Sequence, residues 1–159
     1  VARGVTLESS TIEGALDLST GNQNGDVSIE ESVVDGDAGM TFAGPVSGDI
    51  GTEGSRIGGD YEIDVRNNLN GGSDISIGGS TVGGDLIVTV GENANGDISI
   101  EGVDVGGDLT VVVDGRLNGD ISIEGATVGG DLTVDADTER GSGELELGDN
   151  TVGGTVTRP

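Results

Sequence analysis

Aspartate is the polar residue that recurs most regularly in this sequence of 159 residues. One series comprises Asp26, Asp49, Asp74, Asp97 and Asp120, and a second, 11 residues later each time, comprises Asp37, Asp60, Asp85, Asp108 and Asp131. Regularly spaced carboxylates can bind calcium together with backbone oxygens, or they can accept hydrogen bonds from backbone N–H groups of turns. Either use requires a fold that repeats with the period of the aspartates.

The residue types that are missing exclude most catalytic chemistry. The chain has no cysteine and no histidine, and its six basic residues are all arginine. Thiol catalysis, histidine acid–base catalysis and zinc sites are therefore excluded. Enzymes that cleave polysaccharides need a distinct carboxylate pair beside aromatic platforms, whereas this chain has regular carboxylate series, one Tyr and one Phe. We expect a protein that is not an enzyme.

The aspartates mark a repeat that covers the whole chain. Its seven copies start near Gly4, Asp26, Asp49, Asp74, Asp97, Asp120 and Glu144, at spacings of 22, 23, 25, 23, 23 and 24 residues. Within each copy, aliphatic residues alternate with polar ones, and Gly and Asn separate the segments. Alternation with period 2 predicts short strands and turns. Because the 11-residue offset never changes, every insertion falls in the second half of the repeat.

We predict an all-β fold, a single-domain parallel β-solenoid (β-helix) over residues 1–159 with about seven coils of 22–25 residues. A single repeat cannot bury its own apolar edge, whereas stacked coils form one continuous core. The first half of each coil should form a strand, a corner and a short strand. The second half should form a longer strand and a turn of variable length. An antiparallel meander is the rival topology, and the constant offset disfavours it.

In a solenoid the two aspartate series become ladders with about 4.8 Å between neighbours, where unit charges repel by ~0.9 kcal/mol in water. Three compensations are open. The carboxylates can accept backbone N–H bonds of their own turns, or molar salt can screen them. The third is calcium, and its candidate ligands are Asp74, Asp97, Asp120, Asp85, Asp108 and Asp131. Apart from calcium we expect no cofactor.

Thirty acidic and six basic residues give a formal net charge of −24. This charge repels phosphate backbones and anionic lipid, so we expect no nucleic-acid partner. We also expect no membrane insertion, because the sequence lacks an apolar run of 18 residues. The acid excess, with arginine in place of lysine, resembles the composition of haloarchaeal proteins. We therefore expect a halophilic protein that loosens in low salt.

The ends of the predicted solenoid lack a recognisable cap. Six apolar residues lie in the terminal coils: Val5, Leu7, Ile12, Leu145, Leu147 and Val152. A terminal coil exposes a strand edge and part of the core. We expect either that copies of the chain stack end to end on these residues, or that the chain continues in a longer protein.

Strings such as Gly119-Asp120-Ile121-Ser122-Ile123 resemble the repeats of bactofilins, polymer-forming cytoskeletal proteins with β-helical cores. The resemblance covers nearly the whole chain and implies a nucleotide-free filament joined end to end, with a cytoplasmic location. Strings such as Val105-Gly106-Gly107-Asp108-Leu109 also resemble the repetitive stalks of surface adhesins and viral fibres.

These observations predict a non-enzymatic structural protein, a homo-oligomer that self-associates end to end into an extracellular or cell-surface filament. The alternative is the β-helical stalk of a cell-surface adhesin or viral fibre whose recognition domain lies outside this segment. In that alternative the protein is located on the cell surface or the virion.

Overall fold

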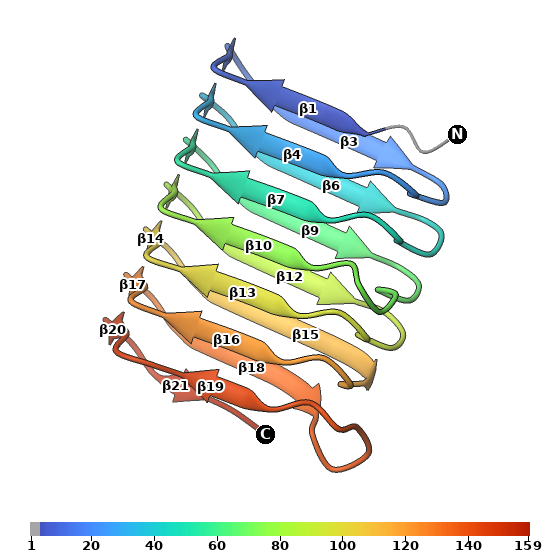
Figure 1. The fold of residues 1–159 in the computed structure, drawn as a ribbon. Coiled ribbons are helices and arrows are strands. Elements are labelled where there is room, and N and C mark those ends of the chain that lie inside the picture. Colours follow the sequence, from blue (N-terminus) through green and yellow to red (C-terminus); the bar gives the residue numbers. More distant parts are fainter. Residues whose placement is uncertain (1–3) are drawn as a thin grey trace.

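The computed structural model describes residues 4–159, which wind into one continuous parallel β-solenoid of about seven coils (Figure 1). All the pairs of neighbouring strands are parallel, so the predicted solenoid is confirmed and the antiparallel meander is wrong. Within these residues there is no helix, and accordingly no helix that could cross a membrane. Val1, Ala2 and Arg3, which the predicted domain includes, lie outside the described residues.

Each coil contributes one strand to each of three seven-stranded sheets. The first sheet contains β1 (Val5–Glu8), β4 (Val27–Glu30), β7 (Ile50–Glu53), β10 (Ile75–Gly78), β13 (Ile98–Glu101), β16 (Ile121–Glu124) and β19 (Leu145–Leu147). The second contains β2 (Thr11–Ile12), β5 (Val33–Val34), β8 (Arg56–Ile57), β11 (Thr81–Val82), β14 (Asp104–Val105), β17 (Thr127–Val128) and β20 (Thr151–Val152). The third contains β3 (Leu16–Thr20), β6 (Ala38–Phe42), β9 (Tyr61–Val65), β12 (Leu86–Val90), β15 (Leu109–Arg116), β18 (Leu132–Asp137) and β21 (Val156–Thr157).

Equivalent residues of successive coils lie directly opposite one another. Ile98 pairs with Ile121 and Ile100 with Ile123, and all four side chains are buried. Inward residues of the three sheets form one hydrophobic core along the axis of the rod. Because the side-chain period of a strand is 2, a shift of one residue would turn these ladders outward, which fixes the register.

The segment after the third sheet is more ordered than the predicted turn. Isolated parallel bridges connect Gln23, Val46, Leu69, Ala94 and Leu117 in successive coils. Four of these residues are buried apolar side chains of the core. The loops of variable length therefore carry a fourth column of stacked residues.

A corner with left-handed backbone separates the first two strands of each of the first six coils. Gly54 and Gly102 have φ values of +57° and +58°, and in the first two coils Ser9 and Glu31 take φ values of +47°. Glycine adopts this conformation without the steric cost that other residues meet. The corner turns the chain from the first sheet into the second within two residues.

One polar pair lies inside the core. Thr52 on β7 replaces the isoleucine of its neighbours Ile29 and Ile77, and its hydroxyl group shares a hydrogen bond with the hydroxyl group of Tyr61 on β9. Both side chains are buried. Burial raises the pKa of Tyr61, and the bond to Thr52 partly opposes this shift.

Candidate functional site

The two aspartate ladders bond one coil to the next. In the second ladder the backbone N–H of Asp108 donates to Oδ1 of Asp85 at 2.8 Å, and the N–H of Asp131 donates to Oδ1 of Asp108 at 2.8 Å. The first ladder has the same geometry, since the N–H of Asp120 donates to Oδ1 of Asp97 at 2.8 Å. Each ladder thus supplies an acceptor for an N–H group just before a strand begins.

The ladders are confirmed, but the predicted partner is wrong. Of the three compensations left open, the local one placed each hydrogen bond within the aspartate's own turn, whereas the carboxylate accepts an N–H of the following coil. From Asp60 onward, the glycine before each second-ladder aspartate makes room for the carboxylate of the preceding coil, because a Cβ on Gly107 would lie 2.0 Å from Oδ1 of Asp85. The Gly-Asp dipeptide therefore stabilises the stack of coils. Its Gly leaves space for the carboxylate of the preceding coil, and its Asp provides the acceptor for the following coil.

The six candidate calcium ligands lie in two separate ladders. Asp74, Asp97 and Asp120 precede first-sheet strands, and Asp85, Asp108 and Asp131 precede third-sheet strands. Oδ1 of each carboxylate accepts a backbone N–H of the next coil. Within residues 4–159 no group of three acidic side chains is arranged to hold a metal ion. Oδ1 of each carboxylate therefore bonds the next coil, and Oδ2 is left for solvent.

A third polar ladder, which the sequence pattern did not predict, lies at the corner after the first sheet. The backbone N–H of Ser32 donates to Oγ of Ser55, and the N–H of Ser55 donates to Oγ of Ser80, each at 3.1 Å. The Ser32 hydroxyl donates to the carbonyl of Glu30 at 2.8 Å. Val103 and Ala126 take this position in later coils, so the serines do not form a repeat that spans the chain.

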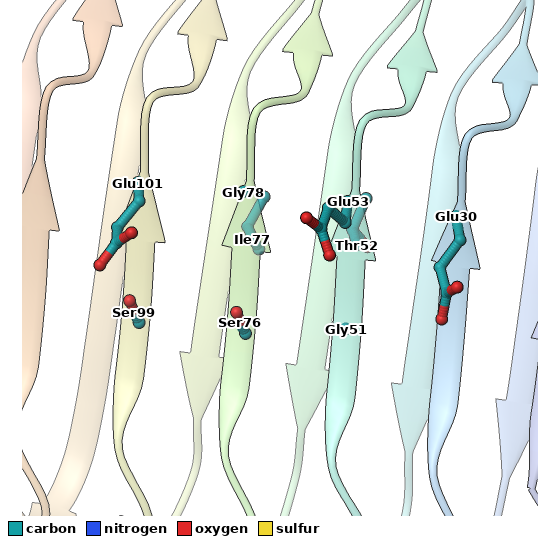
Figure 2. Close-up of a pocket in the computed structure, with 9 residues that line it drawn as sticks. All are labelled: Glu30, Gly51, Thr52, Glu53, Ser76, Ile77, Gly78, Ser99 and Glu101. Atoms are coloured by element: carbon teal, nitrogen blue, oxygen red, sulfur yellow. The ribbon is translucent and has the colours of Figure 1, made fainter.

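The outer face of the first sheet carries an open hollow (Figure 2). Its residues form an acidic row that Gly78 interrupts and a neighbouring row of small residues: Glu30, Glu53 and Glu101, then Gly51, Ser76 and Ser99. The glutamates point outward in Figure 2, and the residues that line the hollow include neither an aromatic nor a basic side chain. The hollow is an open part of the acidic surface.

Few acidic groups on this surface have a basic partner. Residues 4–159 contain three ion pairs, of Arg56 with Asp35, Arg66 with Asp64 and Arg140 with Asp137. In the shortest of them, Nε of Arg66 donates to Oδ2 of Asp64 at 2.8 Å, and this bond raises the pKa of Arg66. Most of the surface charge is therefore balanced by the solvent and its ions.

The N-terminal coil leaves apolar side chains open to solvent. The exposed fraction of Val5 is 42%, whereas that of Val27 at the same position in the next coil is 1%. Leu7 and Ile12 are partly buried and pack against the core. An apolar hollow opens between the first and third sheets, and Leu16 and Leu18 of β3 line it as well.

The C-terminal coil has the corresponding exposure. Val156 is 49% exposed, against 1% for Leu132, its partner in the preceding coil. Leu145, Leu147 and Val152 are partly buried against the core. The structure thus places the six predicted association residues on the two end coils, three on each, and adds Leu16, Leu18 and Val156. The alternation of apolar and polar residues in the second half of the repeat could have identified these three residues.

Comparisons with known proteins give no relative for this chain: no family model, no curated protein and no solved structure matches it. The class that the observations define is that of a parallel β-solenoid repeat protein.

Proposed function

We propose that this protein is a non-enzymatic structural rod that self-associates end to end into a filament. The observation that carries the proposal is the exposure of core positions on both end coils. Val5 and Val156 are 42% and 49% exposed, although Val27 and Leu132 at the equivalent positions are 1% exposed. Stacking a further coil on each end would bury these side chains, at about 25 cal/mol per Å² of apolar surface.

The edges of the sheets support the same proposal. Each end of the solenoid presents the edges of three parallel sheets, formed by β1, β2 and β3 at one end and by β19, β20 and β21 at the other. An open edge carries backbone donors and acceptors that can pair with a strand of another molecule. A second copy offers one strand to each of these three edges, although β19 and β21 are shorter than β1 and β3.

The charge distribution supports growth along the axis and a saline, extracellular or cell-surface location. The net charge of −24 makes the sides of two rods repel each other, because acidic side chains are exposed on the first and third sheets. Molar salt reduces the screening length to about 3 Å and so permits rods to approach. Contact between the ends then gives the largest favourable free energy, because it buries their exposed apolar side chains.

The stalk of an adhesin or viral fibre stays the alternative, because further coils of a longer chain would cover the same side chains. The two functions differ in what the purified chain does. A filament subunit associates by itself, whereas a segment of a stalk does so only as an artefact of its open ends and forms short, irregular oligomers.

Sedimentation velocity in molar salt tests the proposal. Wild-type protein should sediment as a concentration-dependent series of oligomers, and Ile12→Asp and Val152→Asp, which place a charge on an end coil, should each reduce the series to species no larger than two copies. Thr81→Asp is the control for an added charge on the same sheet, since Thr81 lies exposed in the middle of the second sheet. A monodisperse wild-type monomer at all concentrations would contradict self-association.

A further inference from the structure

The two ends of the solenoid are chemically different surfaces. Where a coil begins its first-sheet strand and its third-sheet strand, a backbone N–H group donates to the next coil, toward the C-terminal end. Val5 donates in this way to the carbonyl of Asp26, and Leu16 donates to the carbonyl of Asp37. At its second sheet the coil donates toward the N-terminal end, as Val33 does to the carbonyl of Ser10. The last coil therefore complements a first coil, as every internal pair of coils does.

Every internal junction between coils stacks acidic side chains on one another. The first junction pairs Glu8 with Glu30. The others pair residues of the first aspartate ladder: Asp26 with Asp49, Asp49 with Asp74, Asp74 with Asp97, Asp97 with Asp120, and Asp120 with Glu144. Each junction thus includes like charges at the spacing of neighbouring strands, where they repel.

The register of the repeat predicts a different pairing where the last coil meets the first coil of another copy. The acidic residues of the last coil would face uncharged positions, with Glu144 opposite Gly4 and Glu146 opposite Thr6. Those of the first coil would face uncharged residues too: Glu8 opposite Gly148, Glu13 opposite Gly153, and Asp17 opposite Thr157. Among the described residues, no acidic side chain of this junction lies opposite another.

The apolar side chains match in the same register. Leu145 would lie opposite Val5, Leu147 opposite Leu7, Val152 opposite Ile12 and Val156 opposite Leu16. Arg158 would lie opposite Leu18, where its aliphatic stem can cover the leucine. These pairs are of the same kind as Ile123 with Leu147 inside the chain.

We propose that the partner of the end surface is a second copy in head-to-tail orientation, with its first coil stacked on the last coil in the register of the internal coils. The inference rests on the proposed self-association and adds polarity and register to it. A head-to-tail contact joins two different surfaces and continues without limit, whereas a contact between two like ends closes a dimer.

The register is tested by a charge on Thr6, which is exposed and pairs with Ser28 inside the chain. Thr6→Glu would place a carboxylate opposite Glu146 and weaken association by roughly twofold to fivefold, because like charges would then face each other across the contact. Adding Glu146→Arg to the same chain should restore association. Ser99→Glu, on the same row in the middle of the rod, is the control and should have no effect.

Polarity is tested by mixing two variants, each blocked at one end. Leu7→Asp and Leu147→Asp should each be monomeric alone, and an equimolar mixture should form a dimer with one copy of each, measured by sedimentation velocity with one variant labelled. A dimer of either variant alone would show that like ends meet and would overturn the head-to-tail contact.

Circular dichroism checks that each variant is folded. If a leucine variant unfolds, Thr6→Glu still tests the contact, because it changes only an exposed side chain. Wild-type filaments that Thr6→Glu leaves unchanged would overturn the register while the proposed function stands. A wild-type chain that stays monomeric would overturn the proposed function itself.

Discussion

Oδ1 of Asp85 accepts the backbone N–H of Asp108 at 2.8 Å, so a side chain of one coil bonds the main chain of the next. Asp108 repeats this relationship with Asp131. The hydrogen bond uses one carboxylate oxygen and needs no negative charge. The acceptor oxygen and the charge of the aspartate therefore have separate effects on stability. The acceptor stabilises the stack, and the charge opposes it.

Two substitutions of Asp85 distinguish these properties. Asp85→Ala removes the acceptor and should lower the free energy of unfolding by about 1–2 kcal/mol. Asp85→Asn keeps an Oδ1 acceptor and removes a charge between Asp60 and Asp108, so it should cost less in molar salt and stabilise the protein in millimolar salt. Urea unfolding at both salt concentrations measures the effect. Equal losses for the two variants in low salt would show that the charge itself is needed.

Calcium should have no specific effect on stability. Oδ1 of each ladder carboxylate is bonded to the next coil, and residues 4–159 contain no arrangement of three acidic groups around one ion. We expect millimolar calcium chloride to shift the Tm no more than magnesium chloride at the same ionic strength. A larger shift with calcium, lost in Asp85→Asn, would restore the calcium interpretation of the ladders.

The buried pair of Thr52 and Tyr61 should behave as a coupled unit. Tyr61→Phe leaves the Thr52 hydroxyl without its partner in the core and should cost about 1–3 kcal/mol, and Thr52→Val should cost a similar amount. The double variant replaces both polar groups with apolar ones and should be more stable than the sum of the single changes predicts. Additive losses in a double-mutant cycle would argue against the bond.

Tyr61 should also make stability depend on alkaline pH. Its pKa is raised in the folded protein, whereas in the unfolded chain it is about 10. The folded state therefore keeps the proton longer, and stability that is complete below pH 10 should fall as the pH rises, by up to about 1.4 kcal/mol per pH unit. Tyr61→Phe, compared by urea unfolding between about pH 8 and pH 11, should lack this decline. The same decline in the variant would assign it to another group.

The period of the sequence was sufficient to predict the solenoid, because the apolar alternation recurs from coil to coil and the five internal coils share the Gly-Asp dipeptide. The period could not show which backbone N–H each carboxylate accepts. For Asp85, an N–H of its own turn and an N–H of the next coil both recur with the same period. Thr52 interrupts an isoleucine ladder in the sequence, and only the fold brings Tyr61 to its hydroxyl group.

Other features were missed because they occur in only part of the chain. The serine ladder includes Ser32, Ser55 and Ser80 and then gives way to Val103, so it does not stand out as a repeat. The column through Leu69 and Leu117 lies in loops of different length, and its register appears only when the coils are stacked. Periodicity identifies what all coils share and overlooks contacts made by a few.

Electron microscopy of the purified wild-type chain in molar salt tests the central claim most directly. Continuous stacking predicts long filaments one rod wide, with a layer line at about 4.8 Å from the strand spacing and an axial repeat of roughly 34 Å from seven coils. Separate rods of that length, monodisperse at every protein concentration, would contradict the account.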